Sequence, residues 1–267
     1  MKRVNGPLAL LAIAALVATG CGGGGDESGG LRGTVTVFAA ASLSDAFAEL
    51  ATDFEQQHPG VNVRLNFAGS ATLRTQLLEG APADLFASAS PVEVAAIAAA
   101  DLVLEQRPLA ANELVIAAET RSERISAFAD LATPGLRLVL AAEEVPAGRY
   151  ARDALALADS EGAFGPNFAD RVLANVRSNE TSVRAALAKV ELGEADAAIV
   201  YATDLAAAQN AAVREIAIPA QFQVPVEYRI ALLKDSESAR TFMDFATSTE
   251  GAAVLARHGF DPPVVAT

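Results

Sequence analysis

The chain has 267 residues, 52% of them apolar, which is enough for one large or two small domains with a buried core. It carries 20 Lys and Arg residues against 33 Asp and Glu residues, giving a formal net charge of −13. An acidic chain of this kind is not expected to bind nucleic acid, which requires a basic face. An anionic ligand would have to be attracted locally by its pocket, because the long-range field of the protein would repel it.

The first segment has the layout of a secretory signal. Positive charge at Lys2 and Arg3 precedes an apolar run from Pro7 to Val17, which ends in small residues before Cys21. The apolar run is about half of the ~20 residues needed to cross a bilayer, and no later charge-free run reaches that length. We therefore predict a signal peptide over residues 1–20, export of the mature protein, and no membrane-spanning segment.

Cys21 is the only cysteine of the chain, so it has no partner for an intramolecular disulfide. Its place directly after small residues favours lipidation, which would anchor the protein to the membrane on the extracytoplasmic, periplasmic side of the cell envelope. A free cysteine beside an ordinary cleavage site is the alternative. The glycine-rich residues that follow predict a flexible tether over residues 21–33.

After this tether, short apolar runs rich in Val, Ile and Leu alternate with longer segments of helical period. The alternation is typical of βαβ units and predicts an α/β fold around a mostly parallel sheet. In chain order, the predicted strands span residues 34–39, 61–67, 84–88, 114–118, 136–141, 195–201, 215–218 and 224–233. The predicted helices span residues 43–56, 71–79, 91–100, 148–157, 182–192, 204–209, 236–247 and 249–257.

The residues needed for most enzymatic chemistry are scarce. No thiol follows Cys21, and the two histidines, His58 and His258, have no partner at metal-ligand spacing, so both are interpreted as surface or capping residues. Neither GxxxxGK[ST] nor GxGxxG is present, which removes the usual nucleotide-binding loops. We predict no enzymatic activity and no cofactor. A small enzyme acting on an anionic substrate is the alternative, and it would need a general base or a metal in the cleft.

Several turns of small residues lie between a predicted strand and the first turn of a predicted helix. Ser42 and Ser70 each follow such a strand, and similar helix starts lie near residues 145–148 and 180–183. A helix N-terminus exposes unpaired N–H groups and a positive dipole end, so a nearby hydroxyl completes an anion site without Lys or Arg. The alternative is that the serines only cap helices, and Ser42 with Asp45 fits a loose capping box.

Five segments between Thr34 and the C-terminus carry a specific resemblance. They read VTVFAAASLSDAF, FAGSATLRTQLLEGAPADLFASA, VPAGRYARDAL, VRAALAKVELGEADAAIVYATD and RHGF. In this order and with these spacings, they closely resemble the molybdate-binding proteins of ABC importers, the ModA family. The run GAPADLF, followed by VPAGRYA and GEADAAIVY, is far more specific than any single glycine motif.

The resemblance implies a two-lobed periplasmic-binding-protein fold of type II, with the oxyanion in the cleft between two α/β lobes. The implied first lobe comprises residues 34–111 and 228–267, and the second comprises residues 112–227. Two crossovers, near Glu113 and Val226, would form the hinge.

The resemblance also implies a ligand site of two hydroxyls from the first lobe, and of backbone amides and a tyrosine from the second. The chain departs from the family pattern at Gly69. Members of the family also have a small hydroxyl residue at this position, so the departure puts one additional hydrogen-bond donor in doubt. The implied oxyanion-binding residues are Ser42, Ser70, Ala147, Val183 and Tyr201.

A site made only of donors suits a dianion such as molybdate, which is fully deprotonated near neutral pH, whereas a carboxylate would repel it. Protonated phosphate would need one acceptor, and rigid amides would not close fully on the smaller sulfate ion. Molybdate and tungstate are nearly the same size, so the sequence does not separate them. A receptor for sulfate or another tetrahedral oxyanion is the alternative.

These observations predict a monomeric receptor that delivers molybdate or tungstate to the permease subunits of an ABC importer. Molybdenum would be held only as molybdate, through the five residues of the implied site. The ion would stabilise the shut form by contacting both lobes. Arg149 and Arg184 lie next to the second-lobe turns, and we expect both side chains to face away from the ion and to support the surface or the lobe.

Overall fold

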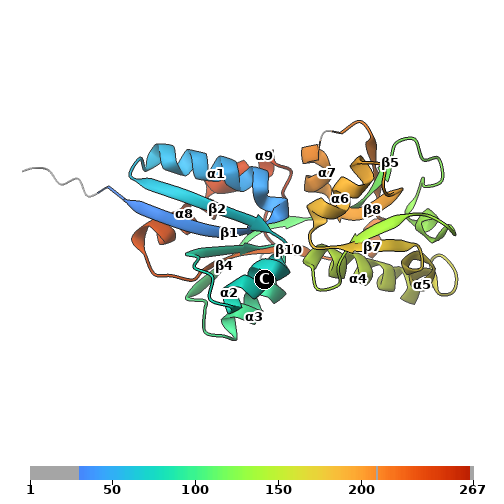
Figure 1. Ribbon diagram of the computed structural model, residues 1–267, viewed down its shortest axis with the longest axis horizontal. Coiled ribbons are helices and arrows are strands. Elements are labelled where there is room, and N and C mark those ends of the chain that lie inside the picture. Colours follow the sequence, from blue (N-terminus) through green and yellow to red (C-terminus); the bar gives the residue numbers. More distant parts are fainter. Residues whose placement is uncertain (1–29, 209, 265–267) are drawn as a thin grey trace, which may run out of the picture. The chain divides into compact units, whose positions relative to one another are not determined.

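The computed structural model describes residues 30–208 and 210–264, so the predicted signal peptide and Cys21 lie outside the described part. Residues Leu31–Thr267 form one compact unit. It contains two five-stranded sheets, each with helices on both faces (Figure 1). No helix within the described ranges is long and apolar enough to cross a membrane. The α/β class predicted from the alternating pattern is confirmed.

The first sheet and its helices are called the first lobe. Helices α1 and α2 and the strands preceding them carry the small-residue turns singled out in the sequence. The strands, in spatial order, are β2 (Val61–Ala68), β1 (Gly33–Ala40), β3 (Leu85–Ser88), β10 (Val226–Leu232) and β4 (Glu105–Asn112). One face carries α1 (Ser44–Gln57), α8 (Glu237–Ala246) and α9 (Thr249–Arg257), and the other carries α2 (Ser70–Leu78) and α3 (Pro91–Ala98).

The second sheet and its helices are called the second lobe. The start of α4 and the start of α6 supply its small-residue turns. The strands, in spatial order, are β7 (Val176–Glu180), β6 (Leu138–Ala141), β8 (Ala197–Tyr201), β5 (Leu114–Glu119) and β9 (Val213–Ala217). The helices are α4 (Pro146–Ser160), α5 (Phe168–Leu173), α6 (Val183–Glu191) and α7 (Ala202–Ala208).

In each sheet four strands point the same way and one runs against them. The reversed strand is β10 in the first lobe, antiparallel to β3 and β4, and β5 in the second lobe, antiparallel to β8 and β9. Both reversed strands adjoin a passage of the chain between lobes, since β4 leads through Glu113 into β5 and β9 leads into β10. Within each sheet the strands are therefore mostly parallel, as predicted.

Two strands and one helix of the described chain were not predicted. β4 contains Pro108, which cannot donate to a ladder, and the strand is tolerated because it lies at the sheet edge beside a register shift between Tyr228 and Arg229. β7 is also an edge strand, and its sequence VRSNE has no apolar run. The six-residue helix α5 is too short to show a helical period.

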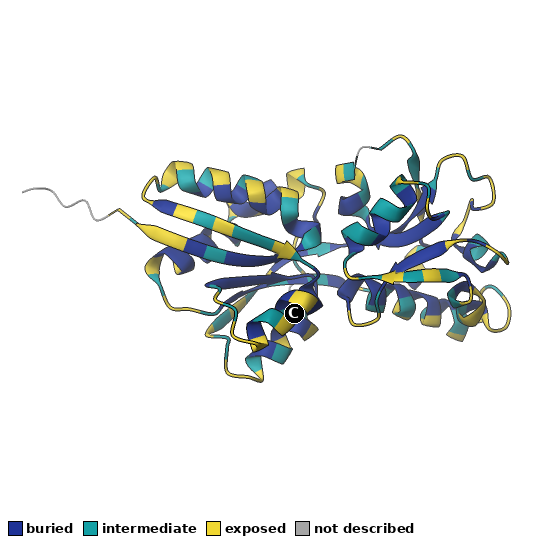
Figure 2. Cartoon of the chain, viewed as in Figure 1, coloured by how far each residue is buried: buried dark blue, intermediate teal, exposed yellow. Residues whose placement is uncertain are grey.

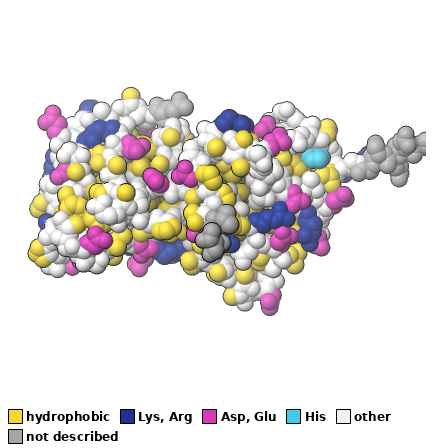
Figure 3. Space-filling model, turned by 180° about the vertical axis from the view of Figure 1, so that it is seen from behind, with side chains coloured by type: hydrophobic (Ala, Val, Ile, Leu, Met, Phe, Trp, Pro, Cys, Tyr) yellow, Lys and Arg dark blue, Asp and Glu magenta, His cyan; other side chains and the backbone are white. Residues whose placement is uncertain are grey.

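The strands supply most of the core. Figure 2 shows the central strands of both lobes as buried and the outer helix faces as exposed. α1 buries an apolar stripe against the first sheet, with Phe54 packed edge to face on Phe242 of α8 at a ring distance of 5.1 Å. Figure 3 shows Lys and Arg side chains interspersed with acidic ones over one face of the molecule. The central strands thus provide a rigid base for the loops at their ends.

Candidate functional site

A small cavity lies where loops of the two lobes meet. Its volume is about 10 Å³, far below the ~300–1,000 Å³ of pockets for drug-sized ligands. The cavity therefore excludes a drug-sized ligand. All five predicted site residues line it, and the full lining is Ala40, Ala41, Ser42, Gly69, Ser70, Ala89, Val145, Pro146, Ala147, Ser182, Val183 and Tyr201.

The two first-lobe serines are buried hydroxyls that do not cap helices. Ser42 is 3% exposed and sits in a short 3-10 helix (Ala41–Leu43) between β1 and α1. Ser70 is 2% exposed and is the first residue of α2, after Gly69 at the N-cap. The N-cap of α1 is Leu43, and no side chain caps either helix. The capping alternative, including the Ser42 and Asp45 box, is therefore wrong.

Each serine oxygen has one hydrogen-bond partner within the first lobe. The Ser70 Oγ accepts the backbone N–H of Ala89 at 3.1 Å. The Ser42 Oγ lies 2.9 Å from the Tyr228 Oη. Because the Ala89 amide can only donate, the proton of the Ser70 hydroxyl stays available for another acceptor.

The second lobe presents two helix N-termini to the cavity. Pro146 is the first residue of α4 and Ala147 the second, while Val183 is the first residue of α6. Amide groups in the first turn of a helix have no intrahelical partner, and they sit at the positive end of the helix dipole. The N-cap side chain of Ser182 accepts the Ala185 N–H at 3.2 Å, so the Val183 amide is not used by this cap. Both amides are thus donors suited to an anion.

Tyr201 supplies the most informative group of the cavity. It ends β8, its side chain is 1% exposed, and its Oη has no hydrogen-bond partner among the described residues. Burial raises the pKa of the Tyr201 phenol well above its usual value, so the group is a neutral donor at physiological pH. A buried donor without a partner costs about 1–3 kcal/mol, and a ligand that accepts its hydrogen bond would remove this penalty.

No charged side chain of residues 30–208 and 210–264 lines the cavity, although two arginines lie on the helices whose starts line it. The Arg149 Nη2 lies 3.2 Å from the Oε1 of Glu93, a fully buried first-lobe carboxylate. The Arg184 Nη2 lies 2.7 Å from the Asp45 Oδ2 of the first lobe, and its Nε lies 2.7 Å from the Asp204 Oδ1. Both side chains therefore face carboxylates and join the two lobes, and Arg184 also supports the second lobe through Asp204.

Gly69 lies tightly against the backbone of the second lobe. A Cβ atom built on Gly69 would lie 2.2 Å from the carbonyl oxygen of Thr181, which precedes α6. Real Cβ atoms essentially never come this close to another heavy atom. The departure from the family pattern at Gly69 thus leaves room for the second-lobe backbone.

The histidines lie at helix ends, away from the cavity. His58 is the C-cap of α1, with its ring 4.5 Å from that of Phe54. His258 is the C-cap of α9, and its Nε2 lies 2.7 Å from a Glu49 carboxylate oxygen. No group of three or more metal-ligating side chains occurs within residues 30–208 and 210–264.

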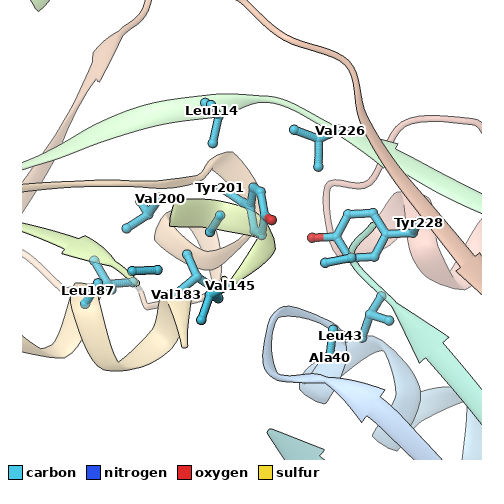
Figure 4. Packing of buried hydrophobic residues seen from close by; sticks show 14 of the residues in the cluster. Ala40, Leu43, Leu114, Val145, Val183, Leu187, Val200, Tyr201, Val226 and Tyr228 are labelled. Atoms are coloured by element: carbon cyan, nitrogen blue, oxygen red, sulfur yellow. The ribbon is translucent and has the colours of Figure 1, made fainter. Parts of the chain in front are cut away.

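One polar residue behind the cavity was missed in the sequence. Tyr228 lies on β10 and is 1% exposed, and Figure 4 shows its hydroxyl and that of Tyr201 directed toward one another from the two lobes. Its contact with Ser42 spans 186 positions of the chain. No local pattern could therefore have indicated the pair.

Two α/β lobes joined by two passages of the chain, with a small donor-lined cavity between them, define a solute-binding protein of the periplasmic type. The sequence model of the family described as "Bacterial extracellular solute-binding protein" matches residues 35–261. The "Molybdate-binding protein ModA" of Mycobacterium tuberculosis is 36% identical over 267 residues, covering 97% of each chain. The chain belongs to this solute-binding family and, within it, to the ModA family.

A further relative agrees with this assignment, and a solved structure agrees with the fold. The "Molybdate-binding protein ModA" of Haemophilus influenzae is 36% identical over 241 residues, covering 85% of this chain and 89% of the relative. The solved periplasmic molybdate-binding protein of Azotobacter vinelandii superposes with a TM-score of 0.73 at 20% identity, covering 86% of this chain and all of that chain. This structural likeness supports the fold.

Proposed function

We propose that the protein captures molybdate or tungstate in the cavity between its lobes. The observation that carries the proposal is a small cavity lined by neutral groups, with the Tyr201 hydroxyl buried and without a partner among the described residues. A carboxylate in the lining would repel a dianion, and the described part of the chain places none there. Relatives named for molybdate binding support the same ligand.

The proposed contacts come from both lobes. The hydroxyls of Ser42 and Ser70 and the phenol of Tyr201 donate to the oxyanion, as do the amides of Ala147 and Val183. A lost hydrogen bond to a charged group costs about 1.5–3 kcal/mol, so Ser70→Ala should weaken molybdate binding roughly ten- to hundredfold. Parental affinity in this variant, measured by calorimetric titration, would contradict the proposed role of Ser70.

The ligand is tested by calorimetric titration of the full chain, kept in detergent, with molybdate, tungstate, sulfate and phosphate. We expect molybdate and tungstate to bind much more tightly than the other two ions. The decisive experiment is competition between sulfate and molybdate, because both ions are dianions without a proton and they differ in size. Preference for sulfate would favour the alternative receptor and refute the proposal.

The proposed motion is a hinge closure of residues 34–111 and 228–267 against residues 112–227, with the hinge near Glu113 and Val226. Arg149 and Arg184 of the second lobe pair with first-lobe carboxylates, so opening of the proposed hinge would break these ion pairs. The closed, loaded monomer would be recognised by the permease subunits of an ABC importer. Small-angle scattering before and after addition of molybdate tests the closure, and an unchanged radius of gyration would contradict it.

A lipid on Cys21 is proposed to hold the protein at the extracytoplasmic face of the membrane. The support is the sequence alone, a signal-like segment that ends at the single cysteine. Cys21→Ala should move the protein from the membrane fraction to the soluble fraction and leave molybdate affinity unchanged. Retention of the variant in the membrane fraction would refute the anchor.

Binding without catalysis is also part of the proposal. Among the described residues, the lining of the cavity offers no carboxylate, imidazole or thiol, and the raised pKa of the Tyr201 phenol makes it a poor general base near neutral pH. An enzyme on this fold would need one of these groups within reach of its substrate. Recovery of the oxyanion unchanged after prolonged incubation with the protein is the expected result.

A further inference from the structure

Tyr228 is a buried tyrosine that contacts the proposed site without lining the cavity. Its Oη is 2.9 Å from the Ser42 Oγ, and the Asn112 Nδ2 lies 3.4 Å from the same Tyr228 oxygen. The Asn112 Nδ2 also donates to the Thr203 Oγ1 at 2.8 Å. Burial, followed by the charge of Asp204, raises the pKa of Tyr228, so its hydroxyl keeps its proton.

The protons in this network have one consistent arrangement. The Asn112 Oδ1 accepts the N–H of Glu113 at 2.9 Å, which turns the Asn112 amide nitrogen toward Tyr228 as a donor. The Tyr228 oxygen is therefore an acceptor from Asn112, and its single proton needs an acceptor of its own. Among the described residues, the Ser42 Oγ is the acceptor within hydrogen-bond distance. The opposite direction would leave a buried phenol proton without an acceptor, which is energetically unfavourable.

We propose that Tyr228 is a positioning residue that holds Ser42 as a donor toward the cavity. Tyr228 donates to the Ser42 oxygen, so the Ser42 proton is free to point at the ligand. This inference rests on the proposed function, because it assumes that an oxyanion occupies the cavity. Tyr228 then does for Ser42 what the Ala89 amide does for Ser70, where the backbone donates to the serine oxygen at 3.1 Å.

The arrangement has a consequence for selectivity. With one lone pair of each serine oxygen occupied by a donor, both hydroxyls are biased toward giving hydrogen bonds rather than receiving them. A hydrogen phosphate ion carries one P–O–H group that needs an acceptor, and molybdate carries none. Tyr228 therefore contributes to the rejection of phosphate although it does not line the cavity.

A double-mutant cycle separates this role from a structural one. The four proteins are the full-length parent, Ser42→Ala, Tyr228→Phe and the double variant, each titrated with molybdate at a temperature at which circular dichroism shows it folded. Tyr228→Phe should weaken binding about tenfold in the parent. In the Ser42→Ala protein the same change should cost nothing further, because Tyr228 acts through Ser42.

The selectivity measurement provides a second readout. Tyr228→Phe should narrow the ratio of molybdate to phosphate affinity, since the freed Ser42 oxygen can accept the phosphate proton. Phe260→Leu is the matched control, because Phe260 packs edge to face on the Tyr228 ring at 5.3 Å without touching the hydroxyl network. This control should melt earlier and keep the parental ratio.

The outcomes are distinguishable from failure of the proposed function. If the parent does not bind molybdate, the proposed ligand is wrong, and the cycle is run with whichever of the four oxyanions the parent binds. The positioning role is refuted if the parent binds and Tyr228→Phe lowers the affinity by the same factor in the parent and in the Ser42→Ala protein. It is also refuted if Tyr228→Phe changes the affinity in neither. Should Tyr228→Phe not fold, Asn112→Leu removes the donor to the Tyr228 oxygen, and its affinity loss must likewise vanish in the Ser42→Ala background.

Discussion

Replacing Gly69 by alanine should block closure of the lobes while leaving each lobe intact. The backbone of Gly69 has φ −59° and ψ 138°, which any L-residue adopts without strain. The added Cβ, however, would lie 2.2 Å from the Thr181 carbonyl oxygen of the other lobe. The clash exists only when the lobes are shut, so the variant should fold normally and fail to close.

The size of the effect follows from this distance. Raising the 2.2 Å contact to 3.4 Å, where ordinary van der Waals contact begins, separates the two turns by about 1 Å. A hydrogen bond of ~2.9 Å stretched by 1 Å is no longer a hydrogen bond. The ligand would then lose contacts between the Ser70 side and the Val183 side. Losing two bonds to a charged group, at about 1.5–3 kcal/mol each, weakens binding roughly hundredfold to ten-thousandfold.

The assay combines calorimetric titration with small-angle scattering. Gly69→Ala should bind molybdate weakly, and its radius of gyration should stay at the ligand-free value after molybdate is added. Its ligand-free unfolding midpoint should match or slightly exceed that of the parent. Gly→Ala lowers the entropy of the unfolded chain and so stabilises the folded protein by about 0.4–1 kcal/mol. Gly69→Ser carries the same Cβ and should fail in the same way. Parental affinity in Gly69→Ala would refute the reasoning.

Three further predictions concern groups around the cavity. Tyr201→Phe removes a buried unpaired hydroxyl, so ligand-free stability should rise or stay level while molybdate affinity, followed by calorimetry, falls about tenfold or more; a parallel loss of both would contradict a ligand role. Arg149→Gln should accelerate molybdate release severalfold in stopped-flow measurements. Arg152 forms its hydrogen bonds within the second lobe, so Arg152→Gln should not accelerate release. Equal release rates in the two variants would contradict a closing role for Arg149. Burial raises the pKa of Asp204 to about 6 from its usual 3.8. The folded protein therefore binds the Asp204 proton more tightly than the unfolded chain does. As the pH rises from about 4 to about 6, the Asp204 carboxyl increasingly destabilises the fold. In chemical denaturation, the free energy of unfolding of Asp204→Asn should therefore rise relative to that of the parent by up to roughly 3 kcal/mol across that pH window. A difference between the two proteins that does not change with pH would contradict the raised pKa.

The regular elements were predictable wherever an apolar run or a helical period marked them. The strand expected at residues 34–39 is β1 (Gly33–Ala40), and the helix expected at residues 249–257 is α9 (Thr249–Arg257). Edge strands escaped because their stability comes from pairing with a neighbour rather than from their own composition. β4, which holds Pro108, is the clearest case.

The residues expected at the site were named from a family resemblance, and the structure brings all five to one cavity. That they hold an oxyanion stays a prediction. The contacts between distant segments were not predictable, since Ser42 meets Tyr228 and Arg149 meets Glu93 only through the tertiary fold. Sequence patterns also suggested serine caps at Ser42 and Ser70 that the structure does not contain.

The division of hydrogen bonds between the lobes has a kinetic consequence. Ser42 with Tyr228, and Ser70 with the Ala89 amide, are complete within the first lobe, so this half of the proposed site exists before closure. An arriving ion would dock there first, at a rate set by diffusion into the open cleft. The ion pairs of Arg149 and Arg184 join the two lobes, so in the proposed closure they would form only afterwards and would act on the residence time. Variants of the first-lobe network and variants of the interlobe ion pairs should therefore differ in which rate constant they change.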